Sequence, residues 1–302
     1  MDALSNGKPI VLDGGMGQEL RRRSSKPASP LWSSQVMLDE PELVVAVHRD
    51  FIEAGAQIIT VNTYAATPER LARDGATEWF DTLHTTALDA AHQARNHSGC
   101  PDVKIAGCLP PLVASYHSDV APGHSACLDS YRRIVEAQAR RVDLFLAETL
   151  SLTREAVAAA EAAQLTGLPV WVALTVSDGD GAQLRSGEPL IDAAAKAVDA
   201  GADAVLVNCS APEAISASMH ELAKLGVPFG GYGNGFQSIE ALVPGGTVDS
   251  LTQREDLSPQ AYARYAAYWV DAGASIVGGC CEIGPAHIKA LSQCVRSRIN
   301  GQ

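Results

Sequence analysis

A (β/α)8 TIM-barrel fold, in the α/β class, is predicted by three features of this chain: eight short apolar runs, a stretch of helical periodicity after each run, and a recurring helix-to-strand joint. The runs are nearly continuous in Val, Ile and Leu, as is typical of parallel strands covered on both faces. With 302 residues, 46% of them hydrophobic, the chain is large enough to bury such a core. We expect residues 1–302 to form a single barrel domain.

The expected elements alternate along the whole chain. Strands are predicted at residues 9–16, 56–64, 103–110, 142–150, 169–176, 202–210, 227–234 and 274–281. Helices are predicted at residues 41–54, 77–97, 125–141, 151–166, 190–200, 212–225, 259–272 and 285–298. Proline in the first turn and glycine after the last turn delimit several of these helices. An acidic residue followed by Ala-Gly-Ala forms the joint before three of the strands, because glycine adopts the left-handed conformation that ends a helix.

A doubly wound parallel sheet is the alternative architecture. It would be favoured by a Gly-x-Gly-x-x-Gly phosphate loop after the first strand, and residues 13–18 match that pattern only loosely. The loops that follow strands at residues 111–124 and 235–258 are long, whereas the joints that precede strands are short. This asymmetry favours a barrel, whose active site lies at the carboxyl ends of its strands.

Composition restricts the partners and the compartment. A formal charge of −12 argues against binding to nucleic acid or to an anionic membrane surface, since both require a basic face. The sequence shows neither a signal-peptide pattern nor an apolar run of about 20 residues. We therefore expect a cytoplasmic protein whose seven cysteines are free, metal-bound or catalytic, with small molecules as its partners. No sequence feature defines an oligomeric state.

Three cysteines stand at predicted strand ends. Cys209 ends the sixth strand, and Cys280 and Cys281 end the eighth, so all three should meet at one mouth of the barrel. Adjacent cysteines form a disulfide only with strain. Three thiolates suit zinc and leave a fourth tetrahedral position open, which is the mark of a catalytic site. The alternative is that these thiols are small buried hydrophobes, as we expect for Cys108 at the end of the third strand.

Three segments carry a resemblance to a known family. They are Leu12-Asp13-Gly14-Gly15-Met16-Gly17, Val207-Asn208-Cys209 and Gly278-Gly279-Cys280-Cys281. Together they resemble the homocysteine S-methyltransferases, which include S-methylmethionine- and betaine-dependent enzymes. The chain departs from common members of that family at Gln18 and Glu282, and these departures bear on the identity of the methyl donor.

The resemblance implies a set of site residues. The three cysteines would bind Zn²⁺, with the homocysteine sulfur in the open position. Asp13 and Glu148 would bind the ammonium group of homocysteine, and Thr63 matches a threonine that contacts substrate. The matching motifs assign three further residues to the substrate site: Gly14, Met16 and Asn208.

The implied reaction is methyl transfer to homocysteine, giving methionine. A metal-bound thiol is deprotonated, and the thiolate is the nucleophile that attacks a methyl group. We expect a sulfonium donor, S-methylmethionine or S-adenosylmethionine. The alternatives are betaine or another onium donor, or a zinc- or thiol-binding barrel without catalysis. Because the donor is cationic, aromatic residues near the mouth are candidates for its contacts: Trp32, Tyr64, Tyr116 and Tyr232.

Overall fold

The computed structural model describes residues 8–26, 33–246 and 250–300. Eight parallel strands form one sheet in the order β1-β8-β7-β6-β5-β4-β3-β2. They are β1 Ile10–Val11, β2 Ile58–Thr60, β3 Lys104–Leu109, β4 Leu144–Leu150, β5 Val170–Leu174, β6 Ala204–Asn208, β7 Phe229–Gly233 and β8 Ile276–Gly279. A parallel bridge between Leu12 and Ile58 joins β1 to β2 and closes the ring. The TIM-barrel prediction is confirmed.

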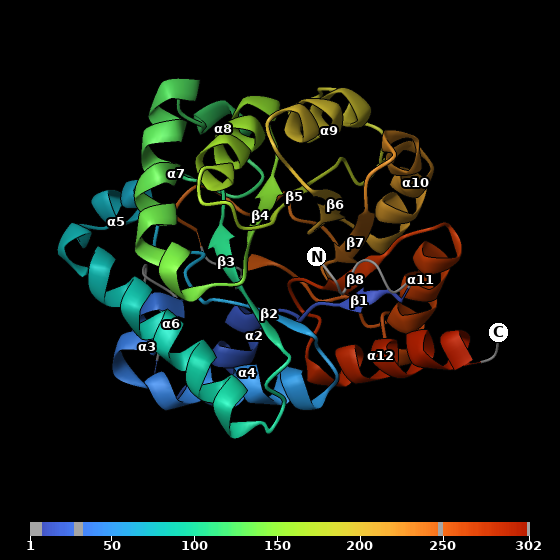
Figure 1. Ribbon diagram of the computed structural model, residues 1–302, viewed down its shortest axis with the longest axis horizontal. Helices are drawn as coiled ribbons and strands as arrows, with labels where there is room; N and C mark the ends of the chain where they lie inside the picture. Colours follow the sequence, from blue (N-terminus) through green and yellow to red (C-terminus); the bar gives the residue numbers. More distant parts are fainter. Residues whose placement is uncertain (1–7, 27–32, 247–249, 301–302) are drawn as a thin grey trace.

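Helices surround the strands on the outside of the barrel (Figure 1). Those that follow the expected pattern are α4 Pro41–Glu53, α6 Phe80–His97, α7 His124–Gln138, α8 Thr153–Gln164, α9 Leu190–Asp199, α10 Pro212–Leu222, α11 Pro259–Asp271 and α12 Pro285–Asn300. Three shorter helices lie in the segments after β1 and β2: α2 Met16–Arg23, α3 Ser33–Asp39 and α5 Pro68–Arg73. They enlarge the carboxyl-end face of the barrel, where the loops are longest.

Alternation along the strands divides the core into two clusters. Residues such as Leu12, Leu146 and Leu206 point into the barrel, where they pack with Trp171 and Tyr232. Their neighbours along each strand point outward and pack against the helices. Every strand is therefore apolar on both faces, which explains why the sequence shows continuous rather than alternating hydrophobic runs.

Several strands end earlier than the sequence predicts, whereas β4 ends at Leu150 as expected. The apolar run at residues 9–16 contains only the two-residue strand β1, and the run at 274–281 contains only the four-residue β8. Single backbone hydrogen bonds continue past these points, from the Asp13 N–H to the Ile58 carbonyl at 3.0 Å and from the Cys280 N–H to the Gly233 carbonyl at 2.9 Å. Asp13 and the cysteines at 280 and 281 therefore stay at the mouth of the barrel. Within the described ranges, no helix is both long and apolar enough to cross a membrane.

Candidate functional site

The three cysteines predicted as metal ligands come together at the mouth of the barrel. Cys209 directly follows β6, and Cys280 and Cys281 directly follow β8, with β7 between them. Their three Sγ atoms all lie within 4.8 Å of one another. The Sγ of Cys209 is 3.7 Å from that of Cys281 and 2.8 Å from that of Cys280. Side chains 71 and 72 residues apart thus form one cluster of sulfur atoms.

The cluster fits a tetrahedral thiolate metal centre. A zinc ion with Zn–S bonds of about 2.3 Å separates two of its sulfur ligands by roughly 3.8 Å. The 3.7 Å separation between Cys209 and Cys281 matches this value, and Cys280 needs a shift of about 1 Å away from Cys209. Burial disfavours charge on Cys209, but hydrogen bonds from Cys280, Cys281 and Tyr116 outweigh it and hold the pKa of the Cys209 thiol well below its usual range. Their hydrogen bonds with Cys209 raise the pKa of the Cys280 and Cys281 thiols well above its usual range, so without a cation the cluster favours a single thiolate, at Cys209.

The residues on either side of Cys209 fix its position. Asn208 accepts a hydrogen bond from the Thr149 N–H at 2.8 Å and donates to the Thr149 hydroxyl at 2.9 Å, which ties the end of β6 to the end of β4. The Ser210 hydroxyl accepts from the Val176 N–H at 3.0 Å, which ties the same segment to the end of β5. An Asn-Cys-Ser sequence thus lets two polar neighbours hold the cysteine between them.

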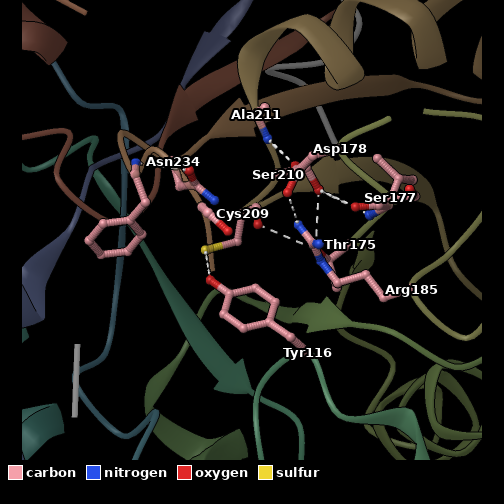
Figure 2. Close-up of polar contacts among 12 residues, drawn as sticks. Tyr116, Thr175, Ser177, Asp178, Arg185, Cys209, Ser210, Ala211 and Asn234 are labelled. Atoms are coloured by element: carbon pink, nitrogen blue, oxygen red, sulfur yellow. Dashed lines mark hydrogen bonds and ion pairs between the residues drawn. The ribbon is translucent and has the colours of Figure 1, made fainter. Parts of the chain in front are cut away.

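Tyr116 connects the cysteine cluster to the surface of the barrel mouth. Its hydroxyl lies 2.9 Å from the Sγ of Cys209, and Figure 2 shows the two side chains pointing toward each other. The guanidinium of Arg185 lies over the Tyr116 ring, 5.0 Å from its centroid, and pairs with Asp178 at 3.0 Å. Tyr116 comes from the long loop after β3, so this loop supplies one wall of the site.

Strained backbone is concentrated around the same cluster. Among the described residues, four that are not glycine have a positive φ: Tyr116, Thr149, Cys209 and Glu282. The first three line the cavity at the carboxyl ends of the strands, which we call the main cavity. Glu282 follows Cys281 and pairs with Arg22 of α2. Such conformations cost free energy and persist where surrounding contacts impose them, typically at functional sites.

The cysteines line a cavity that is open to solvent. Asp13, immediately after β1, and Glu148 of β4 also line it. Two consecutive residues of β4, Glu148 and Thr149, face this space although neighbours in a regular strand point to opposite sides. The pairing of β4 with β5 shifts between Ala147 and Leu150, and this irregularity brings both residues to the cavity wall, with the Thr149 hydroxyl held by Asn208.

Burial raises the pKa of both carboxyl groups. The pKa of Asp13 is raised to about 8 by desolvation, although the Thr60 N–H donates to its carboxylate at 2.8 Å. The pKa of Glu148 is raised to about 7, again mainly by desolvation. Glu148 accepts hydrogen bonds from the Cys108 thiol at 3.1 Å and from the Tyr232 hydroxyl at 3.5 Å. Within the described residues, the hydrogen bonds of these two desolvated acids involve no basic side chain, so the pair is suited to receive a positively charged group.

The structure separates the predicted substrate residues into two sets. Asp13, Gly14, Met16 and Glu148 line the cavity. Asn208 lies behind its wall, where it holds Thr149. The Thr63 side chain is also behind the wall, and its hydroxyl accepts a hydrogen bond from Gln138 at 3.3 Å. Three aromatic candidates line the cavity, namely Tyr64, Tyr116 and Tyr232, and the fourth, Trp32, lies outside the described residues.

The glycines of the motifs serve backbone packing. A Cβ atom on Gly14 would lie 2.1 Å from the carbonyl oxygen of Ile283, and one on Gly278 would lie 2.6 Å from the Cβ of Leu12. The N–H of Gly15 already donates to the Ile283 carbonyl at 2.9 Å. These glycines therefore let the turn after β1 lie directly against the segment that carries Cys280 and Cys281.

Sequence reasoning missed several residues of the cavity wall. Gln18 was noted only as a departure from the family pattern, yet its buried Nε2 lacks a hydrogen-bond partner in the described structure. Cys108 was expected only to pack, and it donates to Glu148. Arg70 of α5 and the segment 242–246 were not singled out. One sequence signal could have placed Arg70 near the site: it lies in a short helical stretch that follows the second strand.

A first prediction concerns stability in the substrate-free protein. The carboxyl group of Asp13 has a raised pKa in the folded state, so between pH 4 and 8 the folded protein binds more protons than the unfolded chain, and stability falls as pH rises. Asn does not titrate. We therefore expect the difference in melting temperature, Asp13→Asn minus wild type, to become more positive as the pH rises from 5 to 8. Thermal unfolding monitored by circular dichroism measures this, and a difference that is constant with pH contradicts it.

Fold and site together define a TIM-barrel protein with a three-thiol cluster on the wall of a cavity at the carboxyl ends of the strands. A sequence model of the homocysteine S-methyltransferases matches residues 10–295, and the chain belongs to this family of enzymes.

Named relatives of similar length support this membership. Homocysteine S-methyltransferase from Escherichia coli is 32% identical, with 93% of this chain and 94% of the relative covered. Selenocysteine Se-methyltransferase from Brassica oleracea is 29% identical, with 97% and 90% covered. The crystal structure of the Escherichia coli homocysteine methyltransferase MmuM in its metallated form superposes with a TM-score of 0.81, at 29% identity, over 97% of this chain and 98% of that chain.

Proposed function

We propose that this enzyme transfers a methyl group from a sulfonium donor to the sulfur of homocysteine and gives methionine. We further propose that Zn²⁺ is its cofactor, that Cys209, Cys280 and Cys281 hold the metal, and that residues 1–302 act as one domain. The observation that carries the proposal is the convergence of these three thiols on the wall of the main cavity. Family membership supports homocysteine as the acceptor.

The chemistry requires a thiolate and a positively charged donor. When bound, the zinc ion keeps the homocysteine sulfur deprotonated and nucleophilic at neutral pH. The sulfur lone pair forms a bond to the methyl carbon while the bond from that carbon to the donor sulfur breaks. The bonding electrons return to the donor sulfur, which leaves as a neutral thioether. No residue needs to remove a proton during this step, since the nucleophile is already ionised.

The chain's own side chains hold the reactants. Asp13 and Glu148 receive the ammonium group of homocysteine, and their burial makes the ion pair stronger than in water. Tyr64, Tyr116 and Tyr232 line the same cavity as the cysteines. Their π faces attract an onium group, although Arg70 and Arg185 already lie over Tyr64 and Tyr116.

The test of this proposal is methionine formation with a panel of donors. We expect homocysteine with S-methylmethionine to give the highest rate, S-adenosylmethionine a lower one, and glycine betaine the lowest. The panel also includes selenocysteine as acceptor, because a plant relative is named for it. Homocysteine binding without methyl transfer from any donor overturns the proposal and supports a non-catalytic binding protein.

A further inference from the structure

Arg70 is a cationic side chain on the wall of the main cavity. It lies in α5, and its Nε and Nη2 donate to the carbonyl oxygen of Pro111 at 3.3 and 2.9 Å. Nη2 also lies 3.4 Å from the Ser115 hydroxyl, and the guanidinium carbon is 5.2 Å from the centroid of the Tyr64 ring. All of these acceptors are neutral.

The positive charge of Arg70 has no carboxylate partner within the described part of the chain. Neighbouring Arg73 forms a double hydrogen bond with Asp74, with both distances 2.8 Å. Glu155 influences Arg70 from a distance, but its carboxylate accepts the Leu112 N–H at 2.9 Å and makes no ion pair with Arg70. In a chain with a net charge of −12, an arginine directed at a cavity without an acidic partner indicates a place for an anion.

The charged groups of the cavity wall come from different elements. Asp13 and Glu148 lie with the cysteines at the ends of β1, β4, β6 and β8, and carry the negative charge. Arg70 and Ser115 belong to α5 and the loop after β3, where Ser115 also bonds the Tyr64 hydroxyl at 2.8 Å. The acids suit the ammonium group of the acceptor. Both reactants carry a carboxylate, and Arg70 belongs to elements other than those that hold the thiols and the acids, so we assign it to the carboxylate of the donor.

We propose that Arg70 and the Ser115 hydroxyl bind the carboxylate of the methyl donor. This inference rests on the proposed methyl transfer to homocysteine. It specifies the donor class: an onium compound that carries a carboxylate a few bonds from its methylated centre, as S-methylmethionine does. Guanidinium pairs with carboxylate through two parallel hydrogen bonds, so the contact orients the donor as well as retaining it.

The experiment compares two sulfonium donors with homocysteine as acceptor. S-methylmethionine has a carboxylate, and trimethylsulfonium has none. For Arg70→Met we expect kcat/KM with S-methylmethionine to fall about 100-fold, as for removal of one partner of a buried charge pair. We expect kcat/KM with trimethylsulfonium and the KM for homocysteine to change less than about twofold, because neither depends on this contact. Arg73→Met is the matched control, since Arg73 lies on the same wall and is already paired.

The outcomes separate the inference from the function on which it rests. A wild-type enzyme that forms no methionine with either donor overturns both. An active wild type in which Arg70→Met lowers the rate equally with both donors shows a structural role and overturns the subsite alone. A rise in the KM for homocysteine alone assigns Arg70 to the acceptor and also overturns it. Arg70→Lys keeps the charge with fewer donors, so a selective loss with S-methylmethionine in this milder variant supports the subsite.

Discussion

Replacing Cys209 with serine is expected to abolish both metal binding and methyl transfer. Cys209 touches both other thiols of the cluster, so its loss leaves two sulfur ligands in place of three. Changes to residues that only orient a metal ligand already cost about 10–100-fold in affinity, so loss of a ligand should exceed 100-fold. We expect the purified variant to contain less than about a tenth of the zinc of wild type under the same conditions.

The measurements are metal content by mass spectrometry and methionine formation with S-methylmethionine. Thermal stability gives an independent reading: added Zn²⁺ should raise the melting temperature of the metal-free wild type and leave that of Cys209→Ser unchanged. Cys294→Ser is the control, because Cys294 is also partly buried but lies in α12. Full activity of Cys209→Ser without metal would exclude the thiolate metal centre.

The alternation of strands and helices was predictable because it is encoded locally and repeatedly. Each apolar run is covered on both faces, and each helix ends at a residue that the backbone requires, such as Gly55, Gly201 and Gly273 with their positive φ angles. The same pattern places Asp13, Glu148, Cys209 and Cys280 at one end of the barrel. Closure of the ring then brings together residues that are far apart in the sequence. Local patterns, together with the rule that the carboxyl ends of barrel strands converge at one mouth, therefore suffice to predict where these residues lie.

The rest of the site depends on contacts that no local pattern encodes. Tyr116 reaches Cys209 from a loop, and its ring is held by Arg185, which belongs to the segment after β5. Arg70 reaches the cavity because α5 packs against the loop that contains Pro111 and Ser115. The exact direction of such side chains is set by tertiary packing and by backbone conformations that are unfavourable in isolation. For the same reason the sequence did not indicate that Gly278 accommodates Leu12.

Homocysteine and methionine are expected to bind more tightly as pH rises from 6 to 8. In the free protein the pKa of Asp13 is about 8 and that of Glu148 is about 7, so both carboxyl groups are largely protonated at pH 6. The ammonium group of the ligand favours their ionised forms and lowers both pKa values in the complex. Binding at pH 7 must therefore release protons, and affinity rises with pH until the carboxyl groups are ionised in the free protein as well.

Calorimetry with methionine counts only the protons released by the carboxyl groups, because methionine has no thiol that could release a proton of its own. The heat of binding at pH 7, measured in buffers with different ionisation enthalpies, gives the number of protons released. We expect between one and two for wild type, from two groups with pKa values near or above 7, and fewer for Glu148→Gln. We also expect Glu148→Gln to lower kcat/KM for homocysteine about 100-fold at pH 8, where the lost charge matters most. Binding without proton release would mean that the ammonium group lies elsewhere, and Asp13 and Glu148 would then serve only to shape the barrel mouth.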